Sequence, residues 1–329
     1  MSQPQHHTIR VNGIRLSFVD AGAGPLVLML HGFPETSDVW RHQVAALAAA
    51  GYRAVAPDLR GYGGSEVPSD AAAYTSLDVV GDLVALLDAI DERDAVIVGG
   101  DWGATIAWQA AQIRPDRFRA VAALGVPLMG RAPLPPSKLF PKTHQAIFYT
   151  LHFSEPGVAE QEFERDVPLT LRKLYYAASG DAGARDDPAT PNPFGMVDRQ
   201  LGLLAGLPEP TCLPAWLPEA DFANAVQHFE SSGFQGGLNY YRNLDRNWAL
   251  QAAFDGKRVE VPALFLVGER DPGRSMPGMD QIVAAMPALA ADLRGVEVIP
   301  HAGHWLQQEA PEAVNQALLR FLNGIQQKP

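Results

Sequence analysis

Asp101 lies in the segment Gly99-Gly100-Asp101-Trp102-Gly103, which has the spacing of a nucleophile elbow with aspartate in place of the usual serine. A carboxylate that attacks a saturated carbon forms an ester, which water can hydrolyse, whereas a serine would form a dead-end ether. The motif therefore favours alkyl transfer over acyl transfer. The plainer alternative is an aspartate that only caps the helix beginning at Trp102.

Two late loops supply candidate partners for Asp101. The first contains Glu269 and Asp271, and the second contains His301 and His304. In elbow hydrolases the chain order is nucleophile, acid, histidine, so we expect Asp271 to orient His304. We expect His304 to be the general base for water and mostly neutral at pH 7, because its reference pKa is about 6.5. Glu269 and His301 remain the alternative acid and base.

The early segment His31-Gly32-Phe33-Pro34 follows an apolar run and supplies a candidate oxyanion hole. The backbone N–H groups of Phe33 and Trp102 are the expected donors when water attacks an ester of Asp101. We expect the substrate pocket to be lined by four residues, namely Phe33, Pro34, Trp102 and Trp305.

These residues need a scaffold that brings strand ends together, and the apolar pattern predicts one. Expected strands cover residues 26–30, 52–56, 95–98, 118–124, 263–267 and 296–299, and expected helices cover 39–50, 74–90, 102–113, 279–286 and 311–322. This alternation is typical of a mostly parallel sheet flanked by helices. A proline-rich break starts at Pro127, and residues 128–246 read as an inserted helical cap without a convincing strand. The expected core is therefore residues 1–127 and 247–329.

Composition excludes several other classes of protein. The 329 residues are 47% hydrophobic and 19% charged, which is ordinary for a globular chain and excludes disorder. The net charge of −11 makes a nucleic-acid partner unfavourable. Cys212 is the single cysteine, so the chain has no intrachain disulfide or cysteine metal cluster. We expect no metal at the exposed pair His6-His7 and no cofactor, membrane span or secretory signal. A cytoplasmic location is the default, and a homodimer stays open.

Taken together, the motifs resemble the epoxide hydrolase family of the α/β-hydrolase fold over almost the whole chain. They are His31-Gly32-Phe33-Pro34, Asp58-Leu59-Arg60-Gly61-Tyr62-Gly63-Gly64-Ser65, the elbow, Gly233-Phe234, Asn239-Tyr240-Tyr241-Arg242-Asn243 and Gly303-His304-Trp305. The resemblance implies a helical cap whose two tyrosines hold the epoxide oxygen.

The same resemblance implies Tyr149 and Tyr241 as those tyrosines. A phenol with a pKa of about 10 stays protonated at pH 7 and can donate to an alkoxide leaving group. Nothing else in the sequence separates Tyr241 from Tyr240, or Tyr149 from Tyr175 and Tyr176.

The implied substrates are a small hydrophobic epoxide and water. One residue departs from the family pattern, because Gly100 stands where histidine is usual, and we expect the elbow to lose a supporting contact there. Two alternatives remain. One is a dehalogenase that uses the same aspartate nucleophile, and the other is a ligand-binding protein that has the fold without catalysis.

Overall fold

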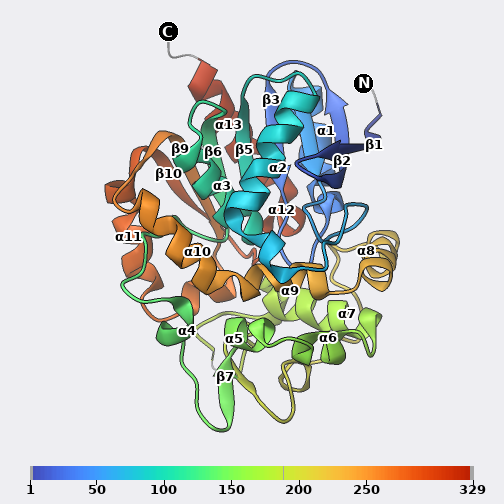
Figure 1. Cartoon of the computed structure of the whole chain (residues 1–329). Coiled ribbons are helices and arrows are strands. Elements are labelled where there is room, and N and C mark those ends of the chain that lie inside the picture. Colours follow the sequence, from blue (N-terminus) through green and yellow to red (C-terminus); the bar gives the residue numbers. More distant parts are fainter. Residues whose placement is uncertain (1–2, 188, 327–329) are drawn as a thin grey trace.

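The computed structural model describes residues 3–187 and 189–326 and is built on an eight-stranded sheet (Figure 1). The strands lie in the order β1-β2-β4-β3-β5-β6-β9-β10. Their bounds are β1 Gln5–Val11, β2 Ile14–Gly22, β3 Leu26–Leu30, β4 Arg53–Pro57, β5 Ala95–Gly100, β6 Phe118–Leu124, β9 Val259–Gly268 and β10 Ala290–Ile299. The six strands from β4 to β10 pair in parallel, and β1 and β2 add an antiparallel edge. The predicted α/β fold is confirmed.

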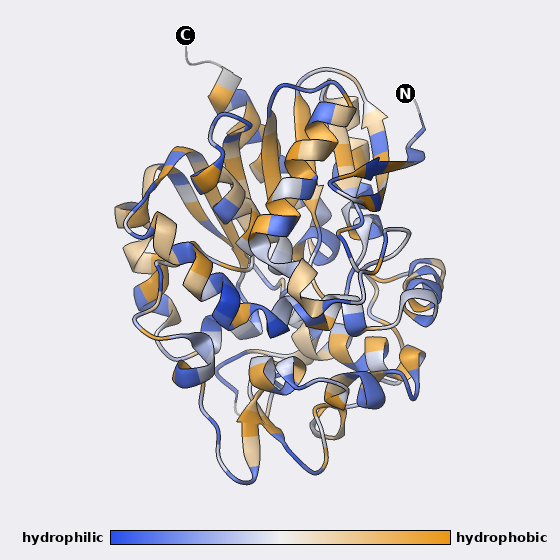
Figure 2. Cartoon of the chain, in the orientation of Figure 1, coloured by the Kyte–Doolittle hydropathy of each residue, from blue (hydrophilic) through white to orange (hydrophobic). Residues whose placement is uncertain are grey.

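Both faces of the sheet are buried, which explains the uninterrupted apolar runs of its central strands (Figure 2). In β3, Leu28 packs in the cluster that includes helices α2 and α3, whereas Val27 packs in the cluster that includes α1 and α13. Successive side chains of a strand point to opposite faces, so one strand contributes to both cores. The core helices are α1 Arg41–Ala49, α2 Ser76–Ala89, α3 Trp102–Ile113, α11 Met279–Leu289, α12 Leu306–Glu309 and α13 Pro311–Gln326.

The predicted core elements are present, and several of them have shifted ends. The helix expected over 39–50 is divided into a 3-10 turn, Ser37–Trp40, and α1. The helix expected over 74–90 begins later, because Thr75 and Asp78 form a capping box in which each side chain accepts the other's backbone N–H. Further 3-10 turns lie at Ala71–Tyr74, Gly180–Ala182, Leu204–Gly206, Gln251–Phe254 and Pro272–Ser275.

The N-terminal hairpin was absent from the sequence prediction. Strands β1 and β2 are joined by Asn12 and Gly13, at φ 47° and 82°. Two positive φ angles in a two-residue loop are typical of a type I′ turn, for which Asn-Gly is the strongest sequence signal. The Asn12-Gly13 dipeptide is therefore the sequence feature from which this hairpin could have been predicted.

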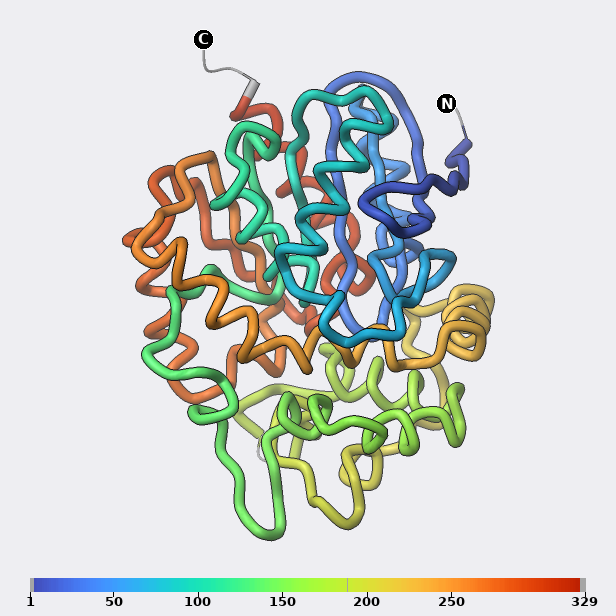
Figure 3. The backbone as a smooth tube through the Cα atoms, viewed as in Figure 1, coloured from blue at the N-terminus to red at the C-terminus, as the bar shows by residue number. Residues whose placement is uncertain are grey.

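The segment 128–246, called the cap segment below, lies between β6 and β9 in sequence and below the sheet in Figures 1 and 3. It is mainly helical, but the expectation that it holds no strand is wrong, because β7 Ala146–Phe148 and β8 Met196–Asp198 form a small antiparallel sheet. Its helices are α4 Pro136–Leu139, α5 Tyr149–Ser154, α6 Val158–Phe163, α7 Val167–Ala178, α8 Glu219–Ser232, α9 Gln235–Arg242 and the start of α10 Leu244–Leu250.

The position of the site follows from the strand order. Strand β3 pairs with β4 on one side and β5 on the other, so the chain leaves β3 where the strand order reverses. Open α/β sheets bind ligands at such a point, outside the carboxyl ends of the strands. No helix in the described part of the chain is long and apolar enough to cross a bilayer.

Candidate active site

Asp101 sits on a strained turn between β5 and α3. Its φ of 51° and ψ of −120° are unusual for a residue with a side chain. Gly99 and Gly103 make the turn possible, since a Cβ on Gly99 would lie 2.1 Å from the Gly103 carbonyl oxygen. The Asp101 side chain makes no capping hydrogen bond to α3. The helix-cap alternative therefore does not describe this side chain.

The imidazole of His304 lies between the carboxylates of Asp101 and Asp271 and contacts both. His304 Nε2 is 3.3 Å from Asp101 Oδ2, and His304 Nδ1 is 3.0 Å from Asp271 Oδ2. The loops that carry Asp271 and His304 follow β9 and β10, as the sequence predicted. Asp271 is completely buried, and its second oxygen accepts the Gly273 N–H at 2.7 Å. Both carboxylates thus have fixed orientations toward the imidazole.

The charge of His304 differs from the expectation. Burial of the imidazole lowers its pKa, but Asp271 and Asp101 outweigh that effect and raise the pKa well above its ordinary value. The expectation of a mostly neutral His304 at pH 7 is therefore wrong for the resting site. The reason is that two carboxylates, rather than one, face the same ring.

The alternative acid and base lie away from Asp101. Glu269 and His301 are solvent-exposed, and Glu269 accepts the His301 backbone N–H at 2.8 Å. Their side chains also approach each other, with His301 Nδ1 3.6 Å from Glu269 Oε2. The geometry therefore favours Asp271 and His304 for the two roles.

The early loop contacts the nucleophile directly. The Phe33 backbone N–H donates to Asp101 Oδ1 at 2.8 Å. Trp102 is the first residue of α3, so its N–H has no acceptor within the helix. The Trp102 N–H is next to Asp101 in the chain, and the Phe33 N–H is next to it in space. An oxyanion hole requires donors in such positions.

Tyr149 and Tyr241 come from α5 and α9 of the cap segment, and their ring centroids are 6.4 Å apart. Burial raises the pKa of both phenols, and the negative charge of Asp101 raises both further. A hydrogen bond with the Trp102 side chain opposes the shift at Tyr241. Both hydroxyls therefore keep their protons at neutral pH, and both are close enough to Asp101 for its charge to affect their pKa.

The competing tyrosines have other partners. The Tyr240 hydroxyl donates to the Arg60 carbonyl at 3.0 Å, and the Tyr175 hydroxyl donates to the Pro34 carbonyl at 2.8 Å. Tyr176 is the neighbour of Tyr175 on α7. These bonds join the cap segment to the core, so Tyr240 and Tyr175 hold the two parts together.

The expected pocket residues differ in their surroundings. Phe33 and Trp102 pack edge-on against Tyr241, with centroid distances of 5.7 Å and 5.1 Å. Trp305 is 2% exposed, and its indole N–H donates to the Tyr175 carbonyl at 2.9 Å. Trp305 thus packs edge-on against the imidazole of His304, with ring centroids 4.9 Å apart.

Two residues near the site were missed by the sequence analysis. Phe194 stacks on Tyr149 at 5.2 Å and lies edge-on to His304 at 4.9 Å, measured between centroids. It belongs to a proline-rich loop with no periodic pattern to reveal it. Glu35 directly follows the Phe33-Pro34 step, is 1% exposed, and has its pKa raised to about 8 by burial.

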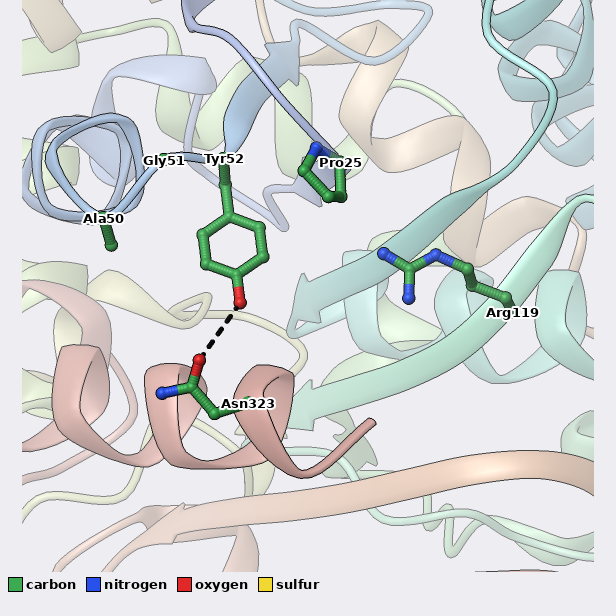
Figure 4. Close-up of a pocket in the computed structure, with 6 residues that line it drawn as sticks. All are labelled: Pro25, Ala50, Gly51, Tyr52, Arg119 and Asn323. Carbon is green, nitrogen blue, oxygen red and sulfur yellow. Dashed lines mark hydrogen bonds between the residues drawn. The ribbon is translucent and has the colours of Figure 1, made fainter. Parts of the chain in front are cut away.

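A surface hollow at the other end of the sheet plays no part in this arrangement (Figure 4). It is lined by Pro25, Ala50, Gly51, Tyr52, Arg119 and Asn323. Tyr52 donates to Asn323 there at 3.4 Å. Pro25 precedes β3, whereas the elbow lies beyond the carboxyl end of β5, so the hollow and Asp101 are at opposite ends of the parallel strands.

The described residues include no group of three or more His, Cys, Asp or Glu side chains arranged to hold a metal ion. Cys212 is exposed.

Comparison with known proteins places the chain in a family. Residues 25–311 match the α/β-hydrolase fold family. The chain is 43% identical to epoxide hydrolase A of Mycobacterium tuberculosis, over 99% of each chain, and 39% identical to an epoxide hydrolase of Caballeronia sordidicola, over 98% of this chain and 94% of that one. A solved epoxide hydrolase from an endophytic Streptomyces superposes with a TM-score of 0.94 at 40% identity, covering 99% of this chain and 97% of that one. The resemblance seen in the motifs is confirmed, and the chain belongs to the epoxide hydrolase family of the α/β-hydrolase fold.

Proposed function

We propose that the protein hydrolyses an epoxide to a vicinal diol through an ester on Asp101. The observation that carries this proposal is the arrangement around one carboxylate. Oδ2 of Asp101 faces His304, Oδ1 accepts the Phe33 N–H, and the charge of Asp101 acts on two phenols of the cap segment. This set supplies a nucleophile, a base, an oxyanion donor and an acid for the leaving oxygen.

In the first half-reaction, the Asp101 carboxylate attacks the less hindered epoxide carbon. A carbon–oxygen bond to the protein forms as the ring carbon–oxygen bond breaks. The ring oxygen takes a proton from Tyr149 or Tyr241, and the phenolate recovers its proton from solvent. The raised pKa of each phenol keeps the proton available at neutral pH.

In the second half-reaction, water attacks the ester carbonyl of Asp101 while His304 takes the water proton. The oxyanion that forms accepts hydrogen bonds from the Phe33 and Trp102 N–H groups. Its collapse breaks the bond to the product oxygen, which takes the proton back from His304 and leaves as the diol. Ester formation has already removed the negative charge of Asp101. Since that charge helps to raise the pKa of His304, ester formation lowers this pKa, and the imidazolium can release its proton to solvent and become the neutral base.

A dehalogenase would share Asp101 but would need side-chain N–H donors for a halide. Phe33 offers no such donor, and the Trp102 side chain bonds to Tyr241. The aromatic side chains around Asp101 favour a small hydrophobic epoxide. No step of this mechanism uses a metal or a cofactor.

His304→Gln tests the covalent mechanism. The variant should form the ester but fail to hydrolyse it, so intact-mass measurement with styrene oxide should show an adduct of one substrate mass. Asp101→Asn should show neither adduct nor diol. An unmodified His304→Gln protein would refute the covalent route, and halide release from chloroalkanes without diol from styrene oxide would indicate the dehalogenase.

Tyr240 and Tyr241 are adjacent, and their variants give a matched test of which residue donates a proton to the epoxide oxygen. Tyr241→Phe should slow ester formation by about 100-fold, the order expected for a lost general acid. Tyr240→Phe removes the same oxygen from a hydroxyl that already bonds the Arg60 carbonyl, so it should affect stability more than rate. Equal rate losses in both variants would contradict the assignment. Tyr149→Phe combined with Tyr241→Phe should abolish ring opening.

A further inference from the structure

Glu309 ends helix α12 and accepts three backbone hydrogen bonds near the imidazole. Its Oε2 accepts the N–H groups of Gly180 and Gly303, each at 2.8 Å. Its Oε1 accepts the N–H of Trp305 at 2.9 Å. Hydrogen bonds from backbone N–H groups to a carboxylate are charge-assisted and stronger than bonds between neutral groups.

These bonds hold the chain on both sides of His304. The residue before it and the residue after it both donate to Glu309, and the His304 N–H itself donates to the Ala178 carbonyl at 2.9 Å. The three consecutive N–H groups are therefore all fixed. Ala178 ends α7, and Gly180 begins the 3-10 turn that follows it in the cap segment. The same carboxyl group therefore also connects the cap segment to the loop that carries the base.

The contact leaves little room for adjustment. A Cβ on Gly303 would lie 2.3 Å from the Gly180 nitrogen, so the two backbones touch. Arg270 adds to the junction by donating to the Gly180 carbonyl at 3.1 Å. The loop that carries His304 is therefore tightly packed against the cap segment.

We propose that Glu309 is a positioning residue for hydrolysis of the Asp101 ester, because its carboxylate fixes the backbone on both sides of His304. The inference rests on the proposed covalent mechanism. Ester formation needs Asp101 and the phenols, whereas ester hydrolysis also needs His304 to be aimed at the attacking water. Loss of the carboxylate should therefore slow the second half-reaction more than the first.

Glu309→Gln is the test, because an amide keeps the size of the side chain but places an NH₂ group against backbone donors. Burial raises the pKa of Glu309 to about 7, so the wild-type carboxylate is ionised at pH 8.5. Single-turnover reactions with styrene oxide at that pH therefore compare the variant with a charged Glu309. Ester breakdown, followed by quenched intact mass, should slow by about tenfold while ester formation changes less than about twofold. The ester should then accumulate at steady state. Glu309→Asp, which keeps the charge, should recover part of the rate.

Glu312→Gln is the matched control, since Glu312 is exposed in the first turn of α13, and it should behave as the wild type. Equal slowing of both half-reactions in Glu309→Gln, or unchanged ester breakdown, would overturn the positioning role. If Glu309→Gln does not fold, equal slowing of both half-reactions in Glu309→Asp would overturn it instead. Absence of any ester in His304→Gln would refute the underlying mechanism, which is a separate result.

Discussion

Glu35 is a buried carboxyl group whose partners come from the other end of the chain. Its Oε1 accepts the side-chain amides of Gln307 at 3.0 Å and Gln308 at 3.1 Å. Burial and, to a smaller extent, the charge of Asp101 raise its pKa, and His304 lowers it, which leaves the pKa at about 8. Glu35 therefore binds a proton in the folded protein at pH values where an exposed glutamate has lost it.

This proton makes stability depend on pH. Between the unfolded pKa of about 4.3 and the folded pKa of about 8, the folded state holds a proton that the unfolded state lacks. The contribution of Glu35 to stability is therefore full below the unfolded pKa and is lost as the pH rises to about 8. Glu35→Gln, which cannot ionise, should raise the Tm at pH 8.5 by roughly 5 °C and leave it nearly unchanged at pH 4.5.

Thermal unfolding followed by circular dichroism at both pH values measures the effect. Glu230→Gln, at an exposed residue of α8, removes a charge without removing a buried proton and serves as the control. If the difference in Tm between Glu35→Gln and the wild type is the same at pH 4.5 and pH 8.5, the raised pKa of Glu35 is contradicted.

Residues that act through local spacing could be predicted, and residues that act through distant contacts could not. Asp101, Asp271 and His304 each follow a strand, so the sheet alone predicts that they converge. Their catalytic roles stay predictions. Glu35 lies 272 positions from Gln307, and no local pattern indicates that pairing. The same holds for Phe194, whose position between Tyr149 and His304 depends on the path of an irregular loop.

At the scale of elements, the strand–turn–helix unit around Asp101 has one glycine that is required and one that is not. A Cβ on Gly99 would lie 2.1 Å from a backbone oxygen, which cannot move without opening the turn. A Cβ on Gly100 would lie no closer than 3.9 Å to the side chains of Gln307 and Trp40. The family's usual histidine is absent here, and a Cβ at Gly100 would make only ordinary van der Waals contacts.

The two adjacent glycines give a matched pair of variants. Gly99→Ala should lower the free energy of unfolding by about 3 kcal/mol or more, as expected for overpacking against rigid backbone. Gly100→Ala should change it by less than about 1 kcal/mol, because the methyl group enters ordinary van der Waals contact. Urea unfolding of the two proteins measures the difference. Equal losses in both would show that the turn tolerates no side chain at either position.

Elements with a strong local signal were also the ones that could be predicted. Helix α3 was predicted with its observed ends, Trp102–Ile113, since it starts at the elbow and stops before Pro115. Strands β7 and β8 were missed because each has three residues and they pair across 48 positions, as Phe148 with Met196 shows. A strand that short has no measurable alternation, and only its distant partner makes it a strand.

At the scale of the whole molecule, one aromatic cluster joins the cap segment to the core. Phe33, from the loop after β3, contacts Phe153 at 5.6 Å, Phe163 at 6.4 Å and Phe234 at 6.1 Å between ring centroids. The three partners all belong to the cap segment. Separation of the two parts would expose these rings to water, at a cost of about 25 cal/mol for each Å² of apolar surface. The division at residues 128 and 246 therefore describes the path of the chain, and we expect the two parts to unfold together.

Calorimetry tests this expectation. Heating should give a single transition whose calorimetric and van't Hoff enthalpies agree. Phe234→Ala should lower the stability by about 3–5 kcal/mol, since Phe234 is fully buried and contacts rings from both parts. Because the ring supports the shared cluster, the whole transition should move to lower temperature without dividing. Two resolved transitions in the wild type would contradict the shared core, and division in Phe234→Ala alone would show that this one ring carries the coupling between the parts.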